Sequence, residues 1–391
     1  MSYLKTDNGK NAAQRLHWLD ILRGIAALSI VIWHWPHFFM HGHVEDLLKA
    51  DKYTPDPHYP LFRFLRPLYG QGWRAVQFFF TLSGFIFFWL YSEKIVARKI
   101  NFGKYLALRF SRLYPLHWLT LLVVIAGQMY IYRLEGTYFV YNNFSLGAFI
   151  GNATLTLNWF TSDFAFNGPS WSVSVEMLLY LIFFALCYNK LNRWWCALLF
   201  VGAGYLLRGT MLDQAGSGLM SFFMGGIVYQ LYSWFNRKIA LKKRIWFSSL
   251  LLPTVLFSAI SWRYILHREP PLYFFELWLF PVIILTTALL ETAIGSGPGK
   301  RLSFIGDISF SSYLWHFPLQ ILFAIGADRL RLGRAVFYSP LTLGLFYVVL
   351  ISVSLISYYK FEHPFQHYLR KKLISPPSGN DAKSRKWQTQ N

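Results

Sequence analysis

The stretch that decides the fold is Leu19-Asp20-Ile21-Leu22-Arg23-Gly24-Ile25-Ala26-Ala27-Leu28-Ser29-Ile30-Val31-Ile32-Trp33-His34-Trp35-Pro36. It is long and apolar enough to cross a bilayer as a helix, yet it contains Asp20, Arg23 and His34. Ionisable groups are rare in such segments and usually face a protein interior or a water-filled cavity. Eleven residues at 100° each make about three turns, so Arg23 and His34 share one helix face, roughly 16–17 Å apart along the axis. The stretch predicts a membrane helix that carries a polar track into the bilayer.

The composition extends this prediction to the whole chain of 391 residues, which is 54% hydrophobic, 20% aromatic and only 14% charged. A soluble domain of this length would need many more polar residues to cover its surface. An all-α polytopic membrane protein is therefore expected, with about ten transmembrane helices. The ten apolar segments lie near residues 19–40, 73–92, 113–132, 170–188, 194–211, 216–235, 245–263, 273–291, 303–325 and 338–360. A further semi-apolar stretch, 144–160, is expected to be interfacial or re-entrant.

The charge pattern predicts the orientation. Most of the 38 Lys and Arg residues lie in the N-terminal segment, in alternate loops and in the tail, so the positive-inside rule favours cytoplasmic N- and C-termini. The net charge of +20 fits a lipid bilayer as partner better than a nucleic acid, because basic residues lie between apolar segments and no nucleic-acid motif is found. The expected organisation is a cytoplasmic segment (1–18), a transmembrane domain (19–365) and a basic, partly disordered cytoplasmic tail (366–391). No small-residue cleavage site follows the first segment, so we expect a retained anchor in a plasma membrane.

His34 is the first candidate for chemistry. A neutral imidazole inside a membrane bundle can take a proton from a hydroxyl, which is general-base work. A structural histidine bonded to a neighbouring helix is the alternative. A metal site built from His34, His37, His41 and His43 is disfavoured, because no carboxylate joins them at helical spacing; no metal is expected.

Two further motifs carry charge. Arg109 and Arg112 are three residues apart, so they are expected on one face at the cytoplasmic mouth of the bundle, where guanidinium groups suit phosphates; the positive-inside rule alone also accounts for them. Glu176 follows Trp171-Ser172-Val173-Ser174-Val175 inside the fourth segment. It either orients His34 or an arginine, or clasps two helices together, and the sequence leaves both open.

A second histidine, His316, shares a helix face with Tyr313 in the ninth segment. It is a second candidate base, although a packing role beside Pro318 is favoured for it.

In this order the motifs resemble acyltransferase family 3, integral membrane O-acyltransferases that act on glycans and related acceptors. The family pattern is Arg or Lys, ten residues and His, matched here by Arg23 and His34. Ile21 stands where the family commonly has Gly. The remaining matches are Phe79-Phe80-Thr81-Leu82-Ser83-Gly84-Phe85, Arg109-Phe110-Ser111-Arg112-Leu113-Tyr114-Pro115, Trp171-Ser172-Val173-Ser174-Val175-Glu176 and Ile308-Ser309-Phe310-Ser311-Ser312-Tyr313-Leu314-Trp315-His316.

The resemblance implies transfer of an acyl group, most often acetyl, from cytoplasmic acetyl-CoA to a hydroxyl of a surface or lipid-linked glycan, in a bacterial inner membrane. His34 would be the base. Trp171, Ser172 and Tyr313 are candidates to stabilise the oxyanion, and the sequence leaves open both which of them does so and whether transfer is direct or passes through an acyl-histidine. The implied sets are His34, Arg23, Glu176 and Asp20 for catalysis, Arg109, Arg112, Arg23 and Tyr114 for the acyl-CoA, and Trp171, Ser172, Tyr313 and His316 for the acceptor.

Two other classes of function stay open on sequence. A proton-coupled secondary transporter would use His34 and Glu176 as a relay, but no paired interrupted segments occur in matching halves. A structural membrane partner would leave the buried ionisable groups without a purpose. The acceptor and the oligomeric state are not predicted.

Overall fold

The computed structural model describes residues 15–40, 55–264, 273–297 and 299–374, and it is all-helical over this part of the chain apart from one isolated β-bridge between Asn143 and Ala165. The α-helices are α1 (His17–Trp33), α3 (Phe62–Gln71), α4 (Ala75–Phe87), α5 (Glu93–Val96), α6 (Phe102–Glu135), α7 (Leu146–Ala153), α8 (Trp171–Tyr188), α9 (Trp194–Leu207), α10 (Asp213–Lys238), α11 (Leu241–Tyr264), α12 (Phe280–Ile294), α13 (Gly299–Leu302), α14 (Phe304–Asp307), α15 (Ser309–Arg329), α16 (Pro340–Ile356) and α17 (His363–Ile374). Short 3-10 or π turns join several of them: η1 (Trp35–Phe39), η2 (Gly72–Arg74), η3 (Phe88–Ser92), η4 (Leu157–Trp159), η5 (Gly168–Ser170), η6 (Phe275–Leu279), η7 (Arg334–Tyr338) and η8 (Ser357–Glu362).

Each of the ten predicted apolar segments falls on a helix. Among the described residues, six helical stretches are long and apolar enough to cross a membrane, and a seventh is added if the pair α13–α14 and α15, bent by 45°, counts as one span. The helices α9, α10 and α11 cover the other three segments; α9 has only 14 residues. The stretch 144–160 forms α7, whose eight residues are too short to span, as predicted.

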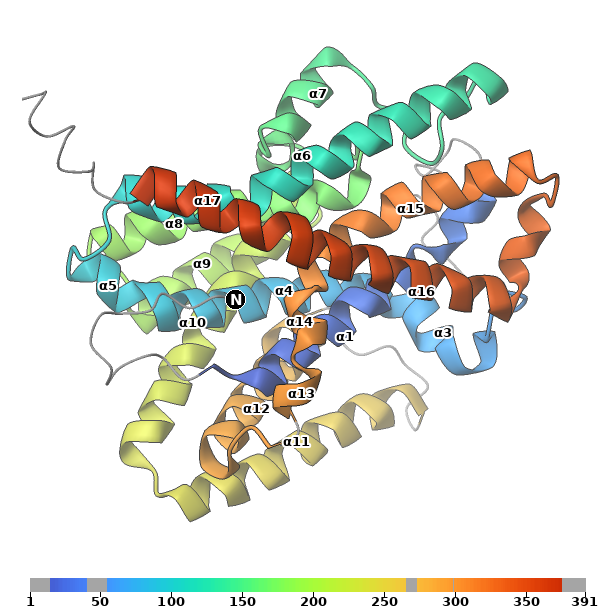
Figure 1. Ribbon diagram of the computed structural model, residues 1–391. Coiled ribbons are helices and arrows are strands. Elements are labelled where there is room, and N and C mark those ends of the chain that lie inside the picture. The colour runs from blue at the N-terminus through green and yellow to red at the C-terminus, as the bar shows by residue number, and fades with distance from the viewer. Residues whose placement is uncertain (1–14, 41–54, 265–272, 298, 375–391) are drawn as a thin grey trace, which may run out of the picture.

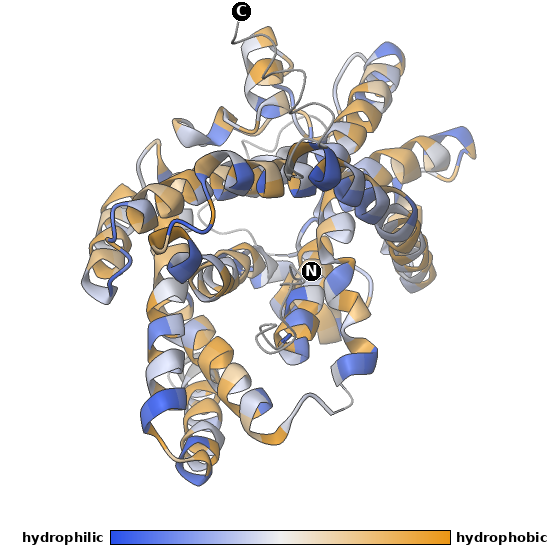
Figure 2. Cartoon of the chain, turned by 60° about the vertical axis from the view of Figure 1, so that its left-hand side comes forward, coloured by the Kyte–Doolittle hydropathy of each residue, from blue (hydrophilic) through white to orange (hydrophobic). Residues whose placement is uncertain are grey.

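The arrangement places α1 inside the bundle (Figure 1). It packs against α4, α14 and α15, while α16, η8 and α17 form a long rod that crosses α6. Figure 2 shows hydrophobic residues along the outward surfaces of many helices as well as inside the bundle. That distribution suits a protein whose outer surface contacts lipid.

Small residues allow α4 and α10 to touch backbone to backbone. A Cβ atom built on Gly84 would overlap the carbonyl of Phe222, and one built on Gly225 would overlap the carbonyl of Thr81. Membrane helices associate through such close approaches, because lipid tails give no hydrophobic drive for helix pairing. The small residues Ser83 and Gly84 within Phe78–Phe85 favour such an approach already in the sequence, and α10 is the partner in the fold.

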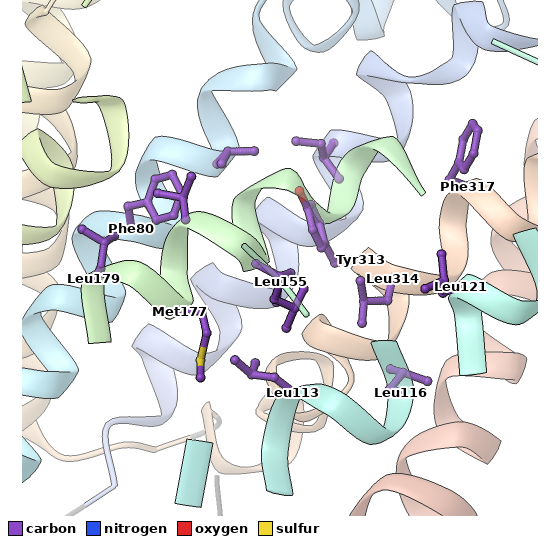
Figure 3. Close-up of a cluster of buried hydrophobic side chains, with 14 of the residues drawn as sticks. Phe80, Leu113, Leu116, Leu121, Leu155, Met177, Leu179, Tyr313, Leu314 and Phe317 are labelled. Atoms are coloured by element: carbon purple, nitrogen blue, oxygen red, sulfur yellow. The ribbon is translucent and has the colours of Figure 1, made fainter. Parts of the chain in front are cut away.

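The core between α4, α6, α8 and α15 is dense and apolar. Figure 3 shows Tyr313 and Phe317 of α15, Leu113 and Leu116 of α6 and Met177 of α8 as members of one cluster of buried hydrophobic side chains. Leu113, Leu116 and Phe317 are at most 1% exposed. This packing fixes the position of α15, which carries His316 and Tyr313.

Candidate functional site

His34 lies where the first membrane helix breaks. α1 ends at Trp33, and η1 begins at Trp35 with Pro36 in its first turn. Proline has no N–H and its ring disfavours a continuing α-helix. The break frees the carbonyl of His34, which accepts a hydrogen bond from Gln320 Nε2 at 2.7 Å. Gln320 Oε1 lies 3.0 Å from His37 Nδ1, so one buried amide holds both histidines.

His34 and His316 form a pair. His34 Nδ1 lies 3.0 Å from His316 Nε2, and the rings stack with centroids 4.9 Å apart and planes 12° apart. His316 is fully buried, and its Nδ1 lies 2.5 Å from the carbonyl oxygen of Tyr313. The structure therefore brings together two residues that are 282 positions apart in the sequence.

Three cavities bear on this pair, and His34 lines one of them. We call that cavity, the largest of the three, the aromatic cavity; its volume is about 560 Å³, and it is lined by Trp33, Trp73, Tyr141, Phe164 and Trp171 together with His34, His37, Gln77, Arg208 and Asp213. The second, the apolar cavity, has a volume of about 90 Å³ and is lined by Phe79, Phe80, Phe87, Ser172, Glu176 and Tyr313, with Arg23 and Arg112. The third, the polar mouth, has a volume of about 20 Å³ and is lined by Arg23, Arg112, Asp307, Glu362, His363 and Gln366.

These cavities adjoin one another. The polar mouth and the apolar cavity share Arg23, Arg112 and Phe310, and the apolar and aromatic cavities share Val76. A series of hydrogen bonds runs from the Tyr313 carbonyl through His316 to His34. It connects the apolar cavity, which Tyr313 lines, with the aromatic cavity, which His34 lines. His34 thus lines the aromatic cavity, and its partner His316 connects it to Tyr313 in the wall of the apolar cavity.

Arg23 and Asp20 belong to an ionic network at the start of α1. Arg23 Nη2 donates to the carbonyl of Gly306 at 2.6 Å and lies 3.1 Å from Asp20 Oδ1. Arg15 bridges Asp20 and Asp307, each at 2.6 Å. Although burial opposes the charge, these two carboxylates raise the pKa of Arg15, so it stays protonated. Asp20 therefore neutralises and holds the arginines.

The predicted arginine pair is split. Arg112 lines both the apolar cavity and the polar mouth, and makes no hydrogen bond or ion pair with the residues the structure describes. Arg109 is only 2% exposed, and its guanidinium lies 4.9 Å from the ring of Phe87, 4.8 Å from that of Tyr91 and 5.6 Å from that of Tyr180. The expectation that both face one opening is wrong for Arg109, because aromatic rings offer the inward-facing guanidinium a cation–π cage.

Glu176 forms a clasp between helices. Its Oε1 accepts from Ser83 of α4 at 2.9 Å and from Tyr180 of α8 at 2.5 Å. It lines the apolar cavity, whereas His34 lines the aromatic cavity. Of the two open interpretations, the helix clasp is the one these contacts match.

The remaining predicted residues divide in the same way. Trp171 lines the aromatic cavity; Ser172 and Tyr313 line the apolar cavity, with their oxygens 2.7 Å apart, and Tyr313 Oη donates to the carbonyl of Pro169 at 2.7 Å. Tyr114 Oη donates to the carbonyl of Thr154. Tyr114 lines none of the three cavities.

Two residues of the site were not predicted. Gln320 was detectable as an amide four residues after His316 in an apolar segment. Arg370 on α17 gave no signal in sequence, because it lies in a basic stretch that reads as tail; in the fold, the charges of Arg109 and Arg112 act on it, and its buried Nε has no hydrogen-bond partner. His41 and His43 lie outside the described residues, which contain no group of three or more metal-ligating side chains placed to hold a metal.

Comparison with known proteins agrees with the resemblance. The chain is 26% identical to the acyltransferase MdmB of Streptomyces mycarofaciens, over 72% of this chain and 77% of that protein. It is 25% identical to the exopolysaccharide production protein ExoZ of Rhizobium meliloti (strain 1021), over 63% and 75% respectively, and 24% identical to the putative acetyltransferase ORF330 of Acidianus two-tailed virus, over 81% and 87%. No solved structure matches significantly. Residues 16–359, which include the histidine pair and almost all of the three cavity linings, match the acyltransferase domain family, and the chain therefore belongs to acyltransferase family 3.

Proposed function

We propose that this acyltransferase moves an acetyl group from acetyl-CoA to a hydroxyl of a surface or lipid-linked glycan, with His34 as general base. The observation that carries the proposal is that His34 lines the aromatic cavity and is linked by hydrogen bonds, through His316, to Tyr313, whose side chain lines the apolar cavity. Two substrates that enter from opposite sides would meet where these two cavities adjoin.

The donor would enter through the polar mouth. Arg112 and Arg23, with Arg370 nearby on α17, present positive charge to the diphosphate and 3′-phosphate of coenzyme A. The apolar cavity behind them would hold the pantetheine arm, and Glu176 with Tyr180 would supply polar contacts along it. Arg109, in its aromatic cage, would position Tyr180 and Tyr91 and leave the phosphates to Arg112.

The acceptor would bind in the aromatic cavity. Flat apolar sugar faces stack on aromatic rings, and Gln77, Arg208 and Asp213 offer hydrogen bonds to hydroxyls. The name of the relative ExoZ supports a polysaccharide-type acceptor. Trp171 belongs to this cavity, while Ser172 and Tyr313 lie on the donor side. Because Tyr313 donates its hydroxyl hydrogen to the carbonyl of Pro169, the hydroxyl of Ser172 is the one we propose as donor to the oxyanion.

The reaction would be a nucleophilic acyl substitution. His34 takes the proton of the acceptor hydroxyl while the oxygen of that hydroxyl bonds to the thioester carbonyl carbon. The carbon–sulfur bond then breaks and coenzyme A leaves as a thiolate, which receives the proton from the imidazolium.

The topology we propose has ten membrane helices in one domain, residues 19–365, with both termini in the cytoplasm of a bacterial inner membrane. The support is that α9, α10 and α11 occupy the three predicted segments that are not among the six or seven long apolar stretches, and that two arginines line the polar mouth. The cytoplasmic mouth would then face the supply of acetyl-CoA.

A proton-coupled transporter has less support, because His34 and Glu176 line different cavities and share no hydrogen bond. Proteoliposomes given acetyl-CoA labelled in the acetyl group and a bacterial glycolipid fraction distinguish the two functions. We expect label to become covalently bound to glycolipid. Uptake of label into vesicles without an acylated product, in the wild type and not in His34→Ala, would support the transporter. His58→Ala, at an exposed histidine that lines none of the three cavities, is the control.

A further inference from the structure

The second histidine, His316, has a ring whose protonation the structure constrains. Its Nδ1 faces the carbonyl oxygen of Tyr313 at 2.5 Å. A carbonyl oxygen only accepts hydrogen bonds, so His316 Nδ1 carries a hydrogen. The His316 ring is also fully buried, and its centroid lies 5.6 Å from that of the Tyr313 ring. Its neighbours His34 and Tyr313 carry no charge in their ordinary forms. A buried cation without a counter-ion costs several kcal/mol, and His316 is therefore neutral.

This constraint passes to His34. In a neutral imidazole with a hydrogen on Nδ1, Nε2 is an acceptor. His316 Nε2 faces His34 Nδ1 at 3.0 Å, so His34 Nδ1 must donate. His34 then has its lone pair on Nε2. That atom makes no hydrogen bond with any residue that the structure describes and is not sealed inside the protein, and the ring lines the aromatic cavity.

We propose that His316 is a positioning residue that fixes the tautomer of His34, so that Nε2 is the basic nitrogen offered to the acceptor hydroxyl. This inference rests on the proposed acyl transfer. The relay runs from the Tyr313 carbonyl through His316 to His34, and Gln320 holds the His34 backbone in place. When Nε2 receives the hydroxyl proton, His34 keeps its Nδ1 hydrogen bonded to His316, which stabilises the imidazolium as an acceptor. A base fixed by a third group is a general device for activating a nucleophile.

The relay differs from a role of His316 as a second base. As a relay, residue 316 needs only an acceptor atom at the position of Nε2, and it does not have to gain or lose a proton during the reaction. Glutamine places its side-chain oxygen near that position, whereas leucine fills similar space with no acceptor. His316→Gln and His316→Leu therefore form a matched pair.

The first experiment measures acetyl transfer by the two variants in nanodiscs. We expect His316→Leu to lower kcat by roughly 10²-fold or more, within the range for loss of a positioned base, with the KM for acetyl-CoA within about twofold of wild type. His316→Gln should recover most of that loss. Full activity in His316→Leu would overturn the relay. A His316→Gln variant as inactive as His34→Ala would also overturn it, because His316 itself would then have to gain and lose a proton in the reaction.

The second experiment reads the tautomer without activity. Nitrogen-15 NMR of histidine-labelled protein, assigned with His34→Gln, distinguishes ring nitrogens that carry hydrogen from those that do not. We expect hydrogen on Nδ1 and a lone pair on Nε2 of His34; the opposite tautomer would overturn the relay. Absence of acyl transfer in the wild type would instead defeat the proposed function, and the spectrum would still decide the relay.

Discussion

Arg112→Gln tests how the two neighbouring arginines divide their roles. Arg112 lines the polar mouth and the apolar cavity. Its guanidinium lies 5.9 Å from the ring of Phe310, and it has no hydrogen-bond or ion-pair partner within the described residues. Its removal breaks no hydrogen bond but takes away a positive charge that acts on the partly buried Glu362, so thermal stability should fall only modestly, by about 1 kcal/mol or less. A charged hydrogen bond to phosphate contributes about 1.5–3 kcal/mol, which corresponds to roughly 10- to 150-fold in Kd for acetyl-CoA.

Arg109→Gln is the matched comparison. Arg109 has three aromatic rings within 5.6 Å and donates to Tyr91 Oη at 2.5 Å. Its loss removes buried cation–π contacts and leaves a tyrosine hydroxyl without its donor, at a cost on the order of 2–4 kcal/mol in unfolding free energy. The variant should melt earlier and, where folded, bind acetyl-CoA within a few-fold of wild type.

The assay for both is isothermal titration of acetyl-CoA into nanodisc-bound protein, with thermal unfolding followed in parallel. Unchanged affinity in Arg112→Gln, or a folded Arg109→Gln that alone loses binding, would refute the assignment of phosphate contact to Arg112.

Three further predictions concern the wall and the packing. Val76→Trp should fill the junction of the apolar and aromatic cavities and abolish transfer in a product assay while acetyl-CoA still binds. Gly84→Leu should force α4 away from the Phe222 carbonyl and abolish the monodisperse peak in size-exclusion chromatography, whereas Gly344→Leu, on an open face, should not. Glu291→Ala should leave two backbone N–H groups at the start of α1 uncapped and lower the melting temperature through a loss of about 1–3 kcal/mol.

The helical fold was predictable because apolar length and charge bias are one-dimensional signals. All ten segments lie on helices, and the close contact at Gly84 followed from small residues in sequence. The break at His34 was not predicted, although Pro36 signalled it. The expected continuous face from Arg23 to His34 therefore stops one residue short of the histidine.

The site was only half predictable, because side-chain direction depends on partners far away in the chain. Arg109 and Arg112 share a face by spacing, yet the rings of Tyr91 and Tyr180 turn one of them inward. His316 was considered a packing residue or a second base, and its partner could not be known before α1 and α15 were placed side by side. The charges of Arg109 and Arg112 act on Arg370 only because α17 packs against α6.

The central claim is that His34 acts on the acceptor and not on the binding of the donor. The most direct test measures acetyl-CoA affinity and acetyl transfer together in His34→Ala. The account predicts a Kd within about twofold of wild type and a transfer rate lower by roughly 10²–10⁴-fold. A His34→Ala protein that still transfers acetyl groups at the wild-type rate, or that has lost acetyl-CoA binding, would contradict it.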